Sequence, residues 1–191
     1  CALGWACWKT YVGRPEADRV RFIATNLLGS GLGLAGHEDA LSVQLAGLAM
    51  MRRIGVTEYN ILVSQMNLAS TYSELGRLEE ASNMFHDVYS GRLRLNGEEH
   101  QSTLRAALNY ASSLSELQRF EEAKALLRKT LPVARRVLGG KDRLTLKMRW
   151  TYAQSLYLDA GATLDDLREA VTTLEDVEQT ARRVLGGANP N

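Results

Sequence analysis

A glycine-rich stretch, GLGLAG at residues 31–36, has the spacing G-x-G-x-x-G that can cradle the pyrophosphate of a dinucleotide. That chemistry needs a strand before the glycines and a parallel sheet around them. The residues before Gly31 have a helical pattern instead, and we expect the glycines to lie at the turn between two helices. The motif therefore predicts no cofactor site.

The histidines and the paired acids are the other residues that could do chemistry. His37, His86 and His100 stand apart, and no Cys or acidic residue accompanies them at metal-ligand spacing on one helical face. The acids of the repeated EEA stretch open predicted helices, where the helix dipole favours carboxylates. No nucleophile with an adjacent base is recognisable, which leaves only a triad assembled across the fold. We expect no metal site, no catalytic residue and no enzymatic activity.

The stretch ARRVLGG occurs twice, at residues 134–140 and 181–187. It could be a phosphate loop, a basic patch or a repeated structural joint. Cations in the last turn of a helix oppose the negative end of its dipole, and a glycine beyond them can close the helix in the left-handed conformation. This favours a joint, with a basic ridge that meets an acidic partner as the alternative. An arginine stands three residues before each closing glycine, at Arg52, Arg94, Arg136 and Arg183.

The composition is that of a folded helical protein with little net charge. The 191 residues are 45% hydrophobic and 24% charged, with three prolines and a net charge of +1. Few prolines and abundant Leu, Ala, Arg and Glu favour helices over strands. No stretch reaches the apolar length that spans a bilayer, and no global charge points to nucleic acid. We therefore expect neither a membrane nor a nucleic-acid partner.

The cysteines and the chain ends bear on the cellular context. Cys1 and Cys7 are too few for a disulfide scaffold or a zinc site, which favours a reducing compartment and a cytoplasmic location. The sequence begins without Met and ends on ANPN, which has the pattern of a linker. We expect a fragment of a longer protein, cut at both ends.

Internal repeats organise the chain. NLASTYSELGRLEEA at residues 67–81 aligns with NYASSLSELQRFEEA at residues 109–123, so Asn109 lies 42 residues after Asn67. A fainter copy begins at Asn26, and a fourth is offset by 47 because five residues are inserted around AGATLDD, where Thr163 and Asp166 predict a helix cap. Apolar residues at helical spacing flank a turn in each copy, which predicts two helices. The expected repeat units are a partial one at about 1–14, then 15–56, 57–98, 99–140 and 141–187.

These residues resemble the tetratricopeptide repeat, in the 42-residue variety found in kinesin light chains and similar adaptor-like proteins. The resemblance runs from about Val20 to the end of the chain, and it departs from the pattern at Gln118, which stands where Gly76 closes the turn of the preceding repeat. It implies an all-α fold, a right-handed α-solenoid of stacked antiparallel helix pairs that forms one array over residues 1–191. The matching positions are Asn67-Leu68-Ala69, Tyr72, Leu75-Gly76, Glu79-Glu80-Ala81 and Thr103-Leu104.

The resemblance also implies a binding site. In proteins of this class the first helix of each pair lines a concave groove, and an extended peptide commonly lies there. Asn26, Asn67 and Asn109 occupy one position in successive repeats, and a side-chain amide can both donate to and accept from a peptide backbone. A local hydrogen bond between helices is the alternative role. The implied groove residues are Asn26, Asn67, Asn109, Met66, Ser70, Arg105, Ser112, Lys147, Trp150 and Gln154.

Charged and aromatic residues of the expected groove suggest the kind of segment that it holds. Arg105, Lys147 and Arg149 could attract an acidic peptide, or they could be solvated side chains without a partner. Glu116 stands where capture of a C-terminal carboxylate would need a cation, which favours an internal segment. Trp150 would be a strong anchor if it is exposed, whereas a tryptophan at helical spacing is more often part of the core.

The sequence therefore predicts a non-enzymatic, adaptor-like scaffold for protein–protein interaction. We expect it to bind a peptide segment of a protein partner, and we expect no small-molecule substrate. Two other classes stay open: a self-assembly or structural module, and the regulatory repeat arm of a larger enzyme or transcription regulator.

Overall fold

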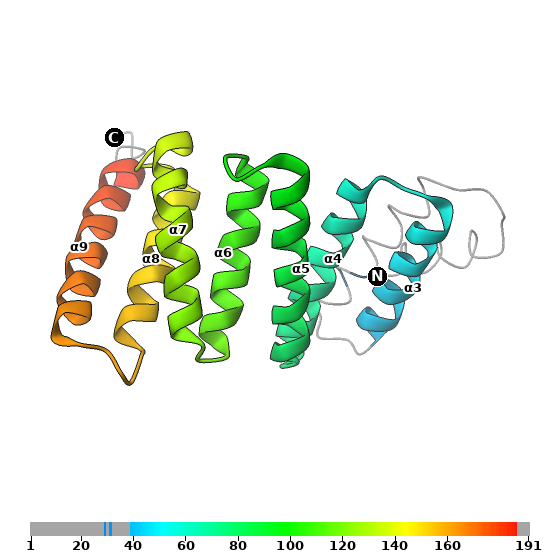
Figure 1. Ribbon diagram of the computed structural model, residues 1–191, viewed down its shortest axis with the longest axis horizontal. Coiled ribbons are helices and arrows are strands. Elements are labelled where there is room, and N and C mark those ends of the chain that lie inside the picture. Colours follow the sequence, from blue (N-terminus) through cyan, green and yellow to red (C-terminus); the bar gives the residue numbers. More distant parts are fainter. Residues whose placement is uncertain (1–28, 30, 32–38, 187–191) are drawn as a thin grey trace. The chain divides into compact units, whose positions relative to one another are not determined.

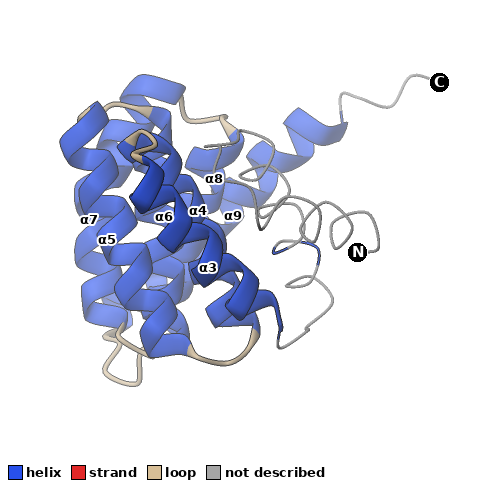
Figure 2. Cartoon of the chain, turned by 90° about the vertical axis from the view of Figure 1, so that its right-hand side faces the viewer, coloured by secondary structure: helices blue, strands red, loops and turns tan. Residues whose placement is uncertain are grey.

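The computed structural model describes residues 29, 31 and 39–186, and within this part of the chain the regular structure is entirely helical (Figure 2). The all-α prediction is therefore confirmed. Asn26, His37 and most of the GLGLAG stretch lie outside the described residues, and Gly31 is helical rather than part of a turn. The helices are α3 (Asp39–Ile54), α4 (Glu58–Glu74), α5 (Leu78–Asn96), α6 (Gln101–Glu116), α7 (Phe120–Leu138), α8 (Arg143–Tyr157) and α9 (Leu164–Gly186) (Figure 1).

The chain divides into two compact units, residues 1–88 and 89–191, with the boundary inside α5. In the first unit α3 packs against α4, and the side chain of Leu68 is fully buried. Two side-chain hydrogen bonds join these helices: Gln44 Nε2 donates to Thr71 Oγ1 at 3.0 Å, and Ser64 Oγ donates to Met51 Sδ at 3.1 Å. Polar side chains thus supplement apolar packing in this helix pair.

The second unit contains α6, α7, α8 and α9, whose connections alternate between the two ends of the helices (Figure 1). Sequential helices are therefore antiparallel neighbours, and α6 also contacts α8. Because α6 and α8 are the first helices of successive pairs, they form one continuous surface of the unit. The core between the helices is built from fully buried Leu127, Met148, Leu156 and Ala111, with Leu104 beside them.

The joints between helix pairs end in glycine, as ARRVLGG predicts. Gly55, Gly97 and Gly139 have φ values of 70°, 79° and 90°, which side chains with a Cβ rarely adopt. Gly186 differs, because α9 continues to that residue. The last turns before these glycines carry the expected cations Arg52, Arg94, Arg136 and Arg183.

Side chains in the same joints begin the following helices. His100 precedes α6, and its Nδ1 accepts a hydrogen bond from Ser102 N at 3.1 Å. Asp142 has the same role before α8, where its Oδ1 accepts from Leu144 N at 2.8 Å. Such caps satisfy backbone donors that the helix itself leaves free. His100 therefore has a structural role at the start of α6.

The turns within helix pairs also need a left-handed residue. Gly76 has a φ of 74°, and at the equivalent turn Gln118 has a φ of 60°, the one positive value of a non-glycine residue in the described part of the chain. A Cβ in this conformation crowds the backbone, which costs about 1 kcal/mol relative to glycine.

Replacing Gln118 with glycine is therefore expected to raise the free energy of unfolding, by about 0.5–1 kcal/mol. Gly76→Ala is the matched reverse change and is expected to lower it by a similar amount. Urea denaturation followed by circular dichroism measures both. A Gln118→Gly variant less stable than the wild type would contradict the strain at this turn.

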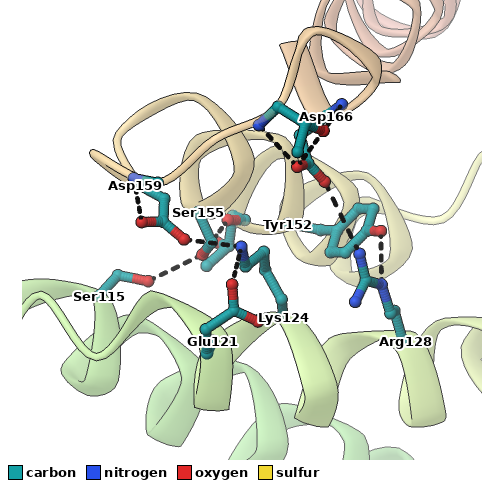
Figure 3. Close-up of polar contacts among 11 residues, drawn as sticks. Ser115, Glu121, Lys124, Arg128, Tyr152, Ser155, Asp159 and Asp166 are labelled. Atoms are coloured by element: carbon teal, nitrogen blue, oxygen red, sulfur yellow. Dashed lines mark hydrogen bonds and ion pairs between the residues drawn. The ribbon is translucent and has the colours of Figure 1, made fainter. Parts of the chain in front are cut away.

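The inserted turn between α8 and α9 is held against α7 by a buried lysine (Figure 3). Lys124 is 3% exposed, and its Nζ donates to Glu121 Oε1 at 2.6 Å and to Asp159 Oδ2 at 2.7 Å. Asp159 Oδ1 accepts a further bond from Gly161 N at 2.9 Å. Although burial opposes the charge of Lys124, the hydrogen bonds with Asp159 and Glu121 raise its pKa above the ordinary value. The ammonium group thus joins α7 to the inserted turn, which has no counterpart in the other repeats.

A second group of polar contacts fixes the start of α9. Thr163 N and Oγ1 both donate to Asp166 Oδ2, and Asp166 N donates back to Thr163 Oγ1, which is the cap predicted from the sequence. Arg128 Nε on α7 donates to Tyr152 Oη at 3.0 Å, and its guanidinium lies 4.0 Å from Asp166 (Figure 3). The inserted turn and the first turn of α9 are therefore both tied to α7.

Acid is expected to weaken these ties. The hydrogen bonds from Lys124 and Gly161 hold the pKa of Asp159 below its ordinary value. A depressed carboxyl pKa contributes stability that is complete above the unfolded-state value of about 4 and is lost as the pH falls through the folded-state pKa. Stability measured by urea denaturation between pH 5 and pH 2 should therefore fall less steeply in Asp159→Asn than in the wild type. Asp165→Asn, an exposed change of equal charge, is the control, and equal slopes for all three proteins would contradict the prediction.

Candidate functional site

A groove of about 530 Å³ lies between α6 and α8 in the second compact unit. The structure brings three of the predicted site residues together in it, namely Arg105, Asn109 and Lys147. The first two lie one turn apart on α6, and Lys147 lies on α8. The other lining residues are Gln101, Leu108, Asp142, Arg143 and Leu144.

The sequence analysis missed Gln101 and Arg143, although a signal for both was present. Gln101 lies four residues before Arg105 on α6, and Arg143 lies four residues before Lys147 on α8. Residues four apart share a helix face, so extending the predicted stripe by one turn on each helix would have found them. The groove therefore extends one turn beyond the prediction, toward the N-terminal ends of both helices.

The groove is lined mainly by cations. Arg105, Arg143 and Lys147 are exposed, and none forms an ion pair with another residue in the described part of the chain. Asp142 is the acid among the lining residues, and its Oδ1 already accepts the hydrogen bond from Leu144 N. The surface between α6 and α8 thus carries more positive than negative charge.

Asn109 lies in this groove half-buried, and its side-chain amide forms no hydrogen bond to any described residue. The alternative role, a local bond between helices, is thus not seen among the described residues. A primary amide offers two donors and one acceptor oxygen, which matches the acceptor and donor of a peptide bond. Asn109 can therefore pair with an extended backbone.

The face of α8 continues the groove surface beyond the lining residues. Trp150 and Gln154 follow Lys147 at intervals of three and four residues, which keeps all three on one side of the helix. Trp150 is 49% exposed, so it is not part of the core, where a tryptophan at helical spacing is more often found. Gln154 on α8 and Ser112 on α6 are half-buried. An exposed indole next to a groove is a suitable anchor for an apolar side chain.

The remaining predicted residues lie on α4 in the first compact unit. Met66, Asn67 and Ser70 are half-buried there, and the structure does not place them in the groove of the second unit. Ser70 Oγ donates to Met66 O at 3.2 Å, so this hydroxyl is used within its own helix. Asn67, like Asn109, has a side chain without a hydrogen bond to the described residues.

Arg149 corrects the sequence analysis, which grouped it with Arg105 and Lys147. Its guanidinium is buried, and Nη2 donates to Asp176 Oδ2 on α9 at 2.6 Å. Two residues on an α-helix are separated by about 200° around its axis, so Arg149 points away from the side that carries Lys147. It joins α8 to α9 and is not available to a ligand in the groove.

Metal-binding clusters and membrane-spanning helices were sought among the described residues. No three His, Cys, Asp or Glu side chains among these residues are close enough together to hold a metal ion. None of the described helices combines the length and the apolar character that crossing a membrane requires.

Comparison with known proteins identifies the repeats. The family model of the tetratricopeptide repeat matches residues 61–102 and residues 103–143. The two matched segments together contain all of α5, α6 and α7 and most of α4. No curated protein matches the sequence.

Solved structures with similar folds include repeat proteins of the kinesin light chain type. A point variant of the nearly identical TPR-like repeats of a Podosopora anserina protein, assigned as a kinesin light chain, superimposes with a TM-score of 0.82 at 19% identity, covering 96% of this chain and 86% of that one. A second structure of these repeats gives 0.78 at 19% identity, covering 95% and 85%. BtubC (BKLC) from P. vanneervenii gives 0.68 at 14% identity, covering 100% and 92%. At these identities the likeness shows the fold.

Repeats of this class generally mediate contacts between proteins. Two consecutive family matches, the helix pairs and the structural neighbours agree with the repeat pattern of the sequence. Residues 61–143 therefore contain two consecutive tetratricopeptide repeats, and the chain has the all-α solenoid fold that it shares with these structures.

Proposed function

We propose that the chain is an adaptor-like, non-enzymatic scaffold that binds an extended internal segment of a protein partner in the groove between α6 and α8. The observation that carries this proposal is Asn109, whose amide has no hydrogen-bond partner among the described residues and lies in a groove of about 530 Å³. Pockets that hold ligands are commonly about 300–1,000 Å³ in volume.

In this mode of binding, contacts to the backbone of the bound segment and contacts to its side chains have separate roles. The Asn109 amide holds the backbone of the segment, whatever its sequence. Arg105, Arg143 and Lys147 select segments with negative charge, because each of these cations lacks an ion pair within the described residues. Trp150, further along α8, contacts an apolar side chain of the same segment. We propose a cytoplasmic location, which fits a chain without a disulfide framework.

The test uses a peptide selected from a random displayed library against the wild-type chain, with its dissociation constant measured by fluorescence anisotropy. Asn109→Ala is expected to weaken binding about tenfold, because two net hydrogen bonds contribute about 1–2 kcal/mol and each 1.4 kcal/mol is a factor of ten. Asn83→Ala, an exposed asparagine on α5, is the matched control and should leave the affinity unchanged. Wild-type affinity in Asn109→Ala, with the helix content intact by circular dichroism, would rule out the groove as the site.

A further inference from the structure

The three groove cations stand out from the other cations of the second compact unit. Arg105, Arg143 and Lys147 approach one groove from two helices, yet none has a carboxylate partner among the described residues. Several other cations of the unit form ion pairs, whereas Lys129, Arg135 and Lys141 lack one within the described residues but do not line the groove. Ion pairs in the described part of this unit involve Arg119, Lys124, Arg128, Arg136, Arg149, Arg168 and Arg182.

The acid in the groove, Asp142, offsets only one of these three positive charges. Asp142 accepts from Leu144 N at 2.8 Å, so its carboxylate is oriented toward the first turn of α8. Leu144 and Leu108, which also line the groove, are buried, so part of its floor is apolar. Charge is screened less beside an apolar floor than in open solvent, which strengthens attraction to an anion.

The placement of the cations suits a dianion with several oxygens. Arg143 and Lys147 are one turn apart on α8, which puts their Cβ atoms about 5–6 Å from each other. Arg105 faces the same volume from α6. A carboxylate has one charge and two oxygens, which one guanidinium can satisfy. A phosphate monoester has about −1.5 to −2 charges at pH 7 and three acceptor oxygens, so all three cations can contact it at once.

We propose that the groove selects a segment that carries a phosphorylated serine or threonine, with the phosphate between Arg105, Arg143 and Lys147. This inference rests on the proposed function, because it names the chemistry of the segment held by Asn109. Phosphorylation of the partner then switches binding on at this groove. Contacts of the phosphate with three exposed cations are expected to raise the affinity about tenfold.

Degenerate peptide pools of equal length test the inference, with phosphoserine, serine or glutamate fixed at the centre and random residues on both sides. Retention on the immobilised chain and fluorescence anisotropy should show about tenfold tighter binding of the phosphoserine pool than of the serine pool, with the glutamate pool between them. Arg105→Gln and Lys147→Gln should each lower the gain from about tenfold to about fivefold, because each removes one of three contacts. Arg135→Gln and Lys129→Gln, which remove exposed cations of α7 outside the groove lining, should preserve it.

Three outcomes would overturn the inference. The first is equal binding of the phosphoserine and serine pools, and the second is an equal loss in the control variants. The third is tighter binding of a single-stranded oligonucleotide of matched charge, which would assign the cations to nucleic acid. The proposed function is tested separately by the library-selected peptide. If phosphate adds nothing but Asn109→Ala weakens binding of that peptide, only the phosphate inference is wrong. If Asn109→Ala leaves the affinity of that peptide unchanged, the proposed function is wrong as well.

Discussion

Replacement of Lys124 with alanine is expected to lower the free energy of unfolding of the second compact unit by about 2–3 kcal/mol. The change removes two ion pairs, at 2.6 and 2.7 Å, together with the buried stem of the side chain. Breaking a fully buried pair costs about 3–5 kcal/mol, and the cost is smaller here because Glu121 is exposed to solvent. Urea denaturation followed by circular dichroism measures the loss.

The variant Lys124→Met distinguishes the contribution of the ion pairs to stability from the contribution of apolar packing. Methionine keeps most of the apolar stem, so this variant should lose only the part of the stability that comes from holding Asp159 and Glu121. We expect a loss about half of that in Lys124→Ala. If both variants were as stable as the wild type, the inserted turn would not depend on its contact with α7.

Replacement of Gly139 with alanine should also destabilise the chain, by about 1–3 kcal/mol. Gly139 ends α7 with a φ of 90° and a ψ of 156°, a conformation that is essentially restricted to glycine. The space around an added Cβ is open, so the cost comes from the backbone and not from a clash.

The neighbouring glycine provides an internal control for this effect. Gly140 follows directly in the same ARRVLGG motif, also has open space around an added Cβ, and does not have a positive φ. Gly140→Ala is therefore expected to change stability by less than about 0.5 kcal/mol. Thermal unfolding of the two variants should differ clearly, and equal effects would contradict the assignment of Gly139 as the residue that closes the helix.

The sequence pattern predicts most of the fold because its signals are local and repeated. Helix pairs follow from apolar spacing, and the cap at Thr163 follows from Asp166 three residues later. The register between repeats also places Arg105 and Lys147 in equivalent positions on successive first helices, and the structure puts both in one groove. Whether that groove binds a peptide stays a prediction.

Features that depend on tertiary contacts were not predictable in the same way. Lys124 occupies the position of Ser82 in the preceding repeat, and its partner Asp159 lies at the inserted turn, which has no counterpart in the other repeats. A repeat comparison cannot pair residues of which one has no equivalent. Arg149 is close to Lys147 in the sequence but lies on another side of α8, where it pairs with Asp176 of α9.

The contacts in the second unit also allow it to fold from more than one starting point. The main helix contacts are α6 with α7, α7 with α8, α8 with α9, and α6 with α8, so helices meet only near neighbours along the chain. Low contact order of this kind allows fast folding, since short loops close at little entropic cost. Structure can begin at any one helix pair and then extend helix by helix in either direction.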